Sequence, residues 1–126
     1  MSGPDPIRVL LCDDVEAFRA LMRSSLADDP AIEVVGEAAD GVEGVEAAAA
    51  LQPDVVLLDM SMPRMDGLEA IPRIRRTAPR TTIIGLSSHS AARMRGPSIE
   101  IGAHDYLEKG TGLDDIRAAI HDAADR

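Results

Sequence analysis

The stretch DVVLLDMSMPRMDG, residues 54–67, predicts a buried strand that stops at Asp59 and passes directly into a loop. An aspartate in such a place would ordinarily be a helix cap or a turn residue. However, Asp66, followed by Gly67, already has the position of a cap for the next helix. Asp59 therefore needs another explanation, which the rest of the chain must supply.

Strand-like and helix-like stretches alternate along the chain, which predicts a parallel sheet covered by helices on both faces. Strands are expected at 7–12, 32–38, 54–59, 81–86 and 104–108, and helices over 15–26 and from starts at Asp40, Asp66 and Thr111. The first, third and fourth strands are nearly continuous apolar runs, as strands buried on both faces should be. The second and fifth are more polar and belong at the edges. The predicted fold class is α/β, a doubly wound, flavodoxin-like sheet with strand order 2-1-3-4-5.

The segment 87–103 fits this scheme poorly, because Gly96-Pro97 interrupts the place where a fourth helix should run. We expect an irregular or shortened helix there, with one short turn that starts at Pro97. Pro72 falls inside the third helix, where it removes one backbone hydrogen bond and is expected to kink the axis.

Length and composition restrict the kind of protein. A chain of 126 residues is expected to form a single domain, with residues 1–6 as an N-terminal extension and no output domain. Cys12 is the only cysteine, which excludes an intrachain disulfide and favours a reducing cytoplasm. We find neither a signal peptide nor an apolar run long enough to cross a membrane. The net charge of −9 disfavours direct binding to nucleic acid.

Lys109 is the single lysine of the chain, beside twelve arginines. Codon bias and chance would explain this composition. The alternative is that position 109 needs a compact ammonium on a flexible stem, which arginine does not provide.

Polar side chains follow four of the predicted strands. They are Asp13 and Asp14 after the first, Asp59 after the third, Ser87 after the fourth and Lys109 after the fifth. Because ligands of such sheets bind outside the carboxyl ends of the strands, these side chains are expected to share one site. Clustered carboxylates need a compensating charge, and Mg²⁺, which prefers oxygen ligands, would supply it. Taken alone, Asp13 and Asp14 would fit a helix N-cap pair equally well.

The stretches IRVLLCDD, LLDMSMPRMDGLEAI, TTIIGLSS and GAHDYLEKG together resemble the receiver domains of two-component response regulators. The resemblance covers essentially the whole chain. It implies that Asp59 is the phospho-acceptor and that Asp13, Asp14, Asp59 and the main-chain carbonyl of Ser61 hold Mg²⁺ or Mn²⁺. It further implies that Ser87, the backbone N–H of Ser88 and Lys109 stabilise the phosphoryl group, and that Ser87 and Tyr106 form a switch.

The resemblance also implies partners and the class of activity. The phosphoryl donor would be a sensor histidine kinase or a phosphotransfer protein, and a homodimer is one candidate assembly. The protein would catalyse only its own phosphoryl transfer and dephosphorylation.

Two features depart from or vary within the family. Gly110 follows the lysine where many receivers have proline, and Ser61 and His89 occupy positions that tune hydrolysis of the phospho-aspartate.

Three alternatives stay open at this point. A phosphatase of the haloacid-dehalogenase type resembles Asp-x-Asp at its nucleophile, whereas this chain has Ser61 at the second position. A receiver-like interaction module that takes up no phosphate would be expected to lack part of the acidic pair, the hydroxyl or the lysine. The chain could also be the receiver fragment of a DNA-binding response regulator. The basic cluster of Arg73, Arg75, Arg76 and Arg80 is interpreted as a solvated helix end.

Overall fold

Five parallel strands form the centre of the molecule, in the order β2-β1-β3-β4-β5. The computed structural model describes residues 5–88 and 91–125, with the backbone alone for residues 91–95, so residues 1–4 of the expected extension and His89 lie outside the described residues. The predicted strand order is confirmed, and the two polar strands are the edges. The strands are β1 (Ile7–Cys12), β2 (Ile32–Ala38), β3 (Val55–Asp59), β4 (Thr82–Ser87) and β5 (Asp105–Glu108).

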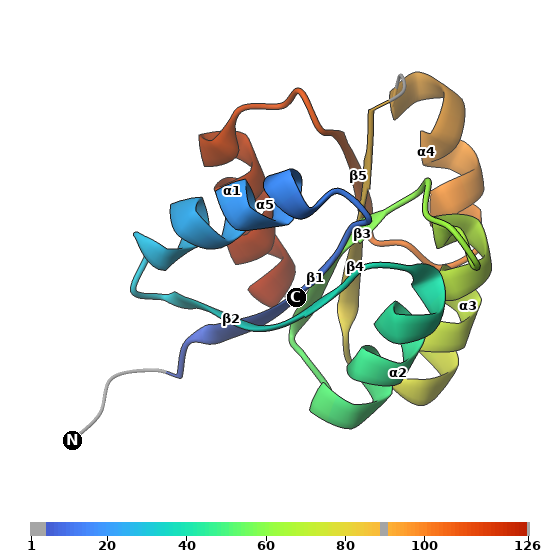
Figure 1. Ribbon diagram of the computed structural model, residues 1–126, viewed down its shortest axis with the longest axis horizontal. Helices are drawn as coiled ribbons and strands as arrows, with labels where there is room; N and C mark the ends of the chain where they lie inside the picture. The colour runs from blue at the N-terminus through green and yellow to red at the C-terminus, as the bar shows by residue number, and fades with distance from the viewer. Residues whose placement is uncertain (1–4, 89–90, 126) are drawn as a thin grey trace.

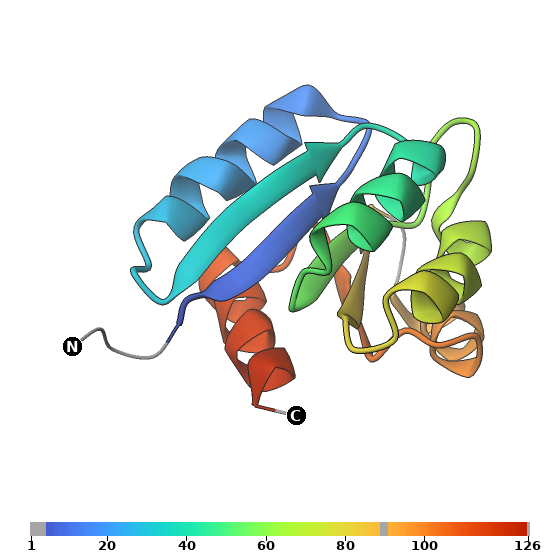
Figure 2. The same cartoon turned by 90° about the horizontal axis from the view of Figure 1, so that it is seen from below.

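Helices cover both faces of the sheet, and each connects two strands or follows the last one (Figure 1). Helices α1 and α5 lie on one face, and α2, α3 and α4 lie on the other, as the turned view also shows (Figure 2). The helices are α1 (Glu16–Ala27), α2 (Gly41–Leu51), α3 (Gly67–Thr77), α4 (Ala91–Glu100) and α5 (Leu113–Ala124). Within the described part of the chain, none of these helices is both long and apolar enough to span a membrane.

The core is split by the sheet into two apolar clusters, and alternate strand residues enter each of them. Leu57 packs with Met22 and Ile120 beneath α1 and α5, whereas Leu58 packs with Ile71 beneath α2 and α3. This alternation explains why the central strands read as continuous apolar runs, because both of their faces are buried.

Helix α4 corrects one prediction. It runs without interruption from Ala91 to Glu100 through Gly96-Pro97, so the expected irregular segment is wrong. At ten residues α4 is still the shortest of the helices in the described residues. Pro97 lies on the exposed side near the end of the helix, while Ser98 is buried and α4 packs against β5. That tertiary contact outweighs the lost backbone bond, and Gly102, with a φ of +124°, turns the chain into β5.

Two of the predicted helix starts are confirmed by their hydrogen bonds. The carboxylate of Asp40 accepts from the backbone N–H of Glu43, and that of Asp66 accepts from the backbone N–H of Glu69, each at 2.9 Å. The start at Thr111 is shifted, because Gly112 is the N-cap of α5 and provides no side-chain cap. Pro72 lies within a continuous α3, and the kink stays a prediction.

Candidate functional site

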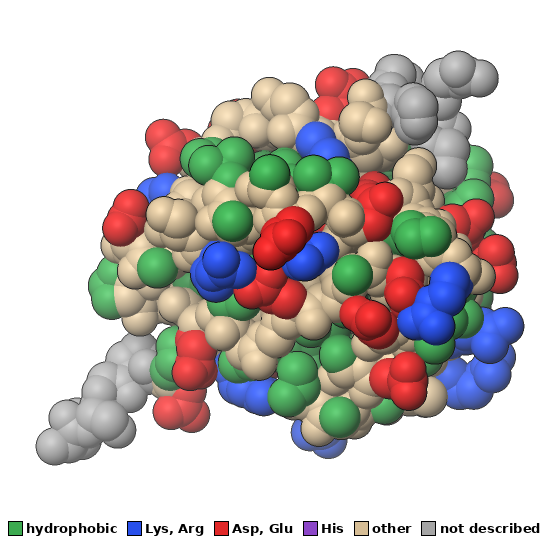
Figure 3. Space-filling view, in the orientation of Figure 1, with side chains coloured by type: hydrophobic (Ala, Val, Ile, Leu, Met, Phe, Trp, Pro, Cys, Tyr) green, Lys and Arg blue, Asp and Glu red, His purple; other side chains and the backbone are tan. Residues whose placement is uncertain are grey.

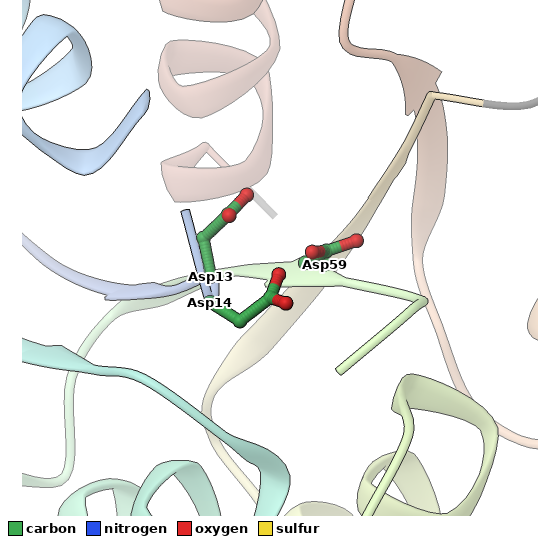
Figure 4. A group of neighbouring side chains, drawn as sticks. All are labelled: Asp13, Asp14 and Asp59. Carbon is green, nitrogen blue, oxygen red and sulfur yellow. The ribbon is translucent and has the colours of Figure 1, made fainter. Parts of the chain in front are cut away.

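Three carboxylates gather at the carboxyl ends of β1 and β3. The strands are neighbours, and their register pairs Cys12 with Leu58, so the residues that follow lie side by side. Asp13, Asp14 and Asp59 each offer a carboxylate oxygen within 4.8 Å of the others (Figure 4). Asp13 and Asp59 are buried at 3% exposure each, whereas Asp14 is exposed to solvent. This edge of the sheet therefore holds a concentrated negative charge, part of it removed from water.

The ammonium of Lys109 lies among these carboxylates. Its Nζ is 2.7 Å from Oδ2 of Asp13 and 3.3 Å from Oδ2 of Asp59, and the lysine side chain is 16% exposed. The backbone N–H of Lys109 donates to the carbonyl of Ser87 at 2.8 Å, which extends the contact of β5 with β4 to this point. Figure 3 shows acidic and basic side chains intermixed near the middle of this face. The single lysine of the sequence thus contacts two of the predicted site residues.

Backbone N–H groups hold the two buried aspartates in place. Oδ1 of Asp59 accepts from the N–H of Ser61 at 3.0 Å, and Oδ1 of Asp13 accepts from the N–H of Val15 at 2.8 Å. The N-cap of α1 is Val15, and no side chain caps that helix. The alternative that Asp13 and Asp14 serve as its N-cap pair is therefore wrong.

Burial and neighbouring charges change the acidity of this cluster. Burial raises the pKa of Asp59 to about 6, with the charge of Asp13 adding to the effect, while the Ser61 N–H and Lys109 oppose it. Burial lowers the pKa of Lys109, but its bond to Asp13 and the charges of Asp59 and Asp13 outweigh that, so the pKa lies above the ordinary value. At neutral pH the site thus contains an ionised carboxylate that the fold disfavours, beside a charged lysine.

The loop after Asp59 is held by close packing against two helices. At Gly67 a Cβ would come within 2.8 Å of the Met60 Cα, and at Gly41 within 2.0 Å of the Met65 carbonyl oxygen, so neither position has room for a side chain. Arg64 adopts a φ of +65° and forms an ion pair with Asp40 at 2.7 Å. These contacts fix the path of the chain through Ser61, whose carbonyl was predicted as a metal ligand.

The donor set fits a hard divalent cation. Three carboxylates share one small volume, and Lys109 contacts only two of them, so the negative charge is not fully compensated. Mg²⁺ and Mn²⁺ take oxygen ligands of this kind and commonly use one or two carboxylates together with water.

Comparison with known proteins identifies the family. The family model described as the response regulator receiver domain matches residues 9–121 of this chain. The chain belongs to the response regulator receiver domain family. Its fold agrees with that of the response regulator domain of Thermotoga maritima CheB, with a TM-score of 0.89 and 31% identity over 96% of this chain and 98% of that one.

Two curated relatives are longer than this receiver domain. The chain is 45% identical over 118 residues to the transcriptional regulatory protein LiaR of Bacillus subtilis, which covers 94% of this chain and 56% of LiaR. It is 43% identical over 104 residues to protein-glutamate methylesterase/protein-glutamine glutaminase 5 of Geobacter metallireducens, which covers 82% of this chain and 29% of that protein. The chain therefore spans about half the length of one relative and under a third of the other.

The residues predicted as the switch of the receiver domain lie on the neighbouring strands. Ser87 is buried at the end of β4, and Tyr106 is buried at 1% exposure in β5. The ring of Tyr106 joins the apolar cluster on the side of the sheet that α2 and α3 cover, whereas the buried residues of α5 belong to the other cluster. Gly85 makes room for it, because a Cβ there would approach the Tyr106 ring to 2.9 Å.

Sequence reasoning missed two residues of α1 beside the site. The ring of Phe18 lies 4.7 Å from the Nζ of Lys109, and the guanidinium of Arg19 donates to the backbone carbonyl of Asp13. The periodicity of the helix identifies Phe18 as an inward residue, but which element it meets depends on how α1 crosses the sheet. The one available signal was that Phe18 is the only phenylalanine in the chain.

Proposed function

We propose that this protein is a phosphorylation-activated receiver that accepts a phosphoryl group on Asp59. The observation that supports this most strongly is the cluster of Asp13, Asp14 and Asp59, within 4.8 Å of one another, with the ammonium of Lys109 in contact with two of them. An aspartate that served only as a helix cap or a turn residue would not need two neighbouring carboxylates and an ammonium. The donor would be a sensor histidine kinase or a phosphotransfer protein.

The carboxylate of Asp59 would act as the nucleophile. One of its oxygens would form a bond to phosphorus while the bond from phosphorus to the donor breaks, which leaves an aspartyl phosphate. The hydrogen bond from the Ser61 N–H to Oδ1 fixes the orientation of the carboxylate. Lys109, 3.3 Å from Oδ2, can transfer its ammonium contact to the incoming phosphoryl oxygens, and the Ser87 hydroxyl and Ser88 N–H would serve the remaining ones.

Asp13, Asp14, Asp59 and the carbonyl of Ser61 would hold Mg²⁺ or Mn²⁺. When bound, the cation would neutralise the carboxylates and the charge of the phosphoryl group. Asp13 is positioned for this role by the Val15 N–H and by Arg19, which together fix its carboxylate and its backbone carbonyl.

The proposed acceptor can be tested by the intact mass of the protein after incubation with acetyl phosphate, with and without Mg²⁺. We expect one Mg²⁺-dependent phosphoryl adduct on the wild type and on Asp66→Asn, a matched control at a helix cap, and none on Asp59→Asn. An adduct that persists on Asp59→Asn would contradict the assignment. If the wild type gave no adduct and also failed to bind beryllofluoride, the alternative of a phosphate-independent interaction module would replace it.

The switch is a separate part of the proposal. Movement of the Ser87 hydroxyl toward the phosphoryl group would bias the packing of Tyr106 and, through it, a protein-interaction surface. Tyr106 is the only tyrosine and the chain has no tryptophan, so its fluorescence reports on this residue alone. Beryllofluoride should change that fluorescence in the wild type and in Ser87→Thr but much less in Ser87→Ala. An undiminished change in Ser87→Ala would refute the coupling.

The chain is also proposed to be a single receiver domain over residues 1–126, with residues 1–6 as an extension. The matched share of LiaR, 56%, favours a second candidate, the receiver segment of a longer transcriptional regulator. Both candidates predict the same adduct on Asp59. The apparent mass of the protein in its native cell, measured by immunoblot, distinguishes them.

A further inference from the structure

The single phenylalanine and the single lysine of the sequence lie against each other. Phe18 is in the first turn of α1, and the centroid of its ring is 4.7 Å from the Nζ of Lys109. The two residues are 91 positions apart in the chain. The ring is half-buried and lines a small apolar cavity together with Met22 and Leu57. Packing against Met22 and Leu57 therefore holds the ring in place, while the face of the ring contacts the ammonium.

The ammonium is consequently bounded by two carboxylates and an aromatic ring. Oδ2 of Asp13 at 2.7 Å and Oδ2 of Asp59 at 3.3 Å accept its N–H groups, whereas the Phe18 ring attracts its charge without accepting a conventional hydrogen bond. The ring also excludes water from that side, and only 16% of the lysine side chain remains exposed. A flexible lysine stem would otherwise be free to carry its charge out to solvent.

We propose that Phe18 is a positioning residue that keeps the ammonium of Lys109 over Asp59, where it can meet a phosphoryl group. This inference rests on the proposed function and deepens it. The ring holds the cation by electrostatic attraction to its face and leaves the N–H groups for oxygen acceptors. Phe18 itself contacts neither the acceptor oxygen nor the phosphoryl group in this role.

The unique phenylalanine allows a test that leaves the shape of the side chain nearly unchanged. Biosynthetic replacement of phenylalanine by its 4-fluoro and 3,4,5-trifluoro analogues alters position 18 alone and weakens the negative potential of the ring face step by step. Beryllofluoride affinity, measured by titration calorimetry at fixed Mg²⁺, should fall in that order. We expect a total loss of about two- to fivefold, which converts to about 0.5–1 kcal/mol.

Three variants separate positioning from packing. Phe18→Leu keeps an apolar side chain but removes the ring, and should weaken beryllofluoride binding at least as much as the trifluoro analogue. Phe18→Tyr keeps the ring face and should restore near wild-type affinity. Met22→Leu changes the wall of the same cavity at nearly constant volume and should leave the affinity unchanged.

A second readout does not depend on phosphoryl chemistry. In protein labelled with ¹³C-lysine, the one set of lysine side-chain signals belongs to Lys109, and its Cε protons should be shifted by the ring current of Phe18 and return toward ordinary values in Phe18→Leu. Equal beryllofluoride affinity across the fluorinated series, in a wild type that binds it, would overturn the positioning role alone. A wild type that shows the ring-current shift but binds no beryllofluoride would overturn the proposed function, and this role with it.

Discussion

Asp40 and Asp66 cap the N-termini of α2 and α3. Asp13 and Asp59 also lie in connections between a strand and a helix, but they cap no helix. The first two each accept a backbone N–H from a residue three positions on, which satisfies a donor at the helix start. The other two point into a shared space with Asp14 and meet Lys109. One residue type at similar positions thus serves helix formation in one case and a charged site in the other.

The pKa values of Asp40 and Asp59 are shifted in opposite directions. The hydrogen bond from the Glu43 N–H holds the pKa of Asp40 below its ordinary value, so the fold favours the ionised carboxylate there. Burial raises the pKa of Asp59 to about 6, so the fold disfavours the ionised form. A negative charge that is retained against its surroundings is available for a cation or a phosphoryl group to stabilise. The comparison therefore separates Asp40, whose ionised form the fold favours, from Asp59, whose ionised form the fold disfavours.

The largest effect is expected when the buried carboxylates of Asp13 and Asp59 lose the ammonium of Lys109. Lys109→Met keeps the apolar stem but leaves two buried carboxylates without their ammonium, so unfolding free energy should fall by about 2–3 kcal/mol at pH 8 without divalent cations. Urea unfolding followed by far-UV circular dichroism measures this in a chain that has no tryptophan. Added Mg²⁺ should restore more stability to Lys109→Met than to the wild type. A loss that Mg²⁺ does not reduce would argue against a cation site.

A smaller effect is expected at the caps. Asp66→Ala removes the acceptor for the Glu69 N–H and should lower the unfolding free energy by about 1 kcal/mol, whereas Asp66→Asn keeps an acceptor and should lose little. Both variants should still form the acetyl phosphate adduct. The comparison would break down if Asp66→Ala folded stably but formed no adduct, because that would place Asp66 in the chemistry.

The smallest effect is expected at the ion pair of Arg64 with Asp40. The arginine side chain is 58% exposed, so Arg64→Met should change the unfolding free energy by less than about 1 kcal/mol. High salt should reduce the difference further, since solvent ions screen such a pair. A destabilisation as large as that of Lys109→Met would show that partial burial does not separate the two ion pairs.

Much of the fold could be predicted because the pattern of apolar residues determines it locally. Continuous apolar runs at 7–12, 54–59 and 81–86 indicated interior strands, and the Asp-Gly-x-Glu spacing indicated the starts of α2 and α3. Helix α4 could not be predicted in this way. Gly96 and Pro97 disfavour a helix locally, and the contact with β5 that outweighs them exists only in the folded protein.

The candidate site, too, could be predicted from the sequence only in part. That Asp13, Asp59 and Lys109 meet follows from strand order, because the carboxyl ends of parallel strands share one edge of the sheet. The contact of Phe18 with Lys109 depends on the crossing of α1 over that edge, which no short-range pattern encodes.

The most direct test of the central claim is the stability of Asp59→Asn relative to the wild type as a function of pH, without divalent cations. Between the unfolded pKa near 3.8 and the folded pKa of about 6, the folded state retains a proton that the unfolded state has lost, so wild-type stability falls as the pH rises. The full difference between these pKa values would correspond to about 3 kcal/mol, and we expect about 1–2 kcal/mol because solvent reaches this edge. Asn lacks this titration but can still accept the Ser61 N–H.

We expect Asp59→Asn to equal the wild type in stability near pH 4, to exceed it at pH 7, and to lose that advantage when Mg²⁺ is added. Urea unfolding at each pH, with Asp66→Asn as the control, measures all three. If Asp59→Asn were instead less stable than the wild type at pH 7 without Mg²⁺, Asp59 would belong with the aspartates that stabilise the fold, and the central claim would be contradicted.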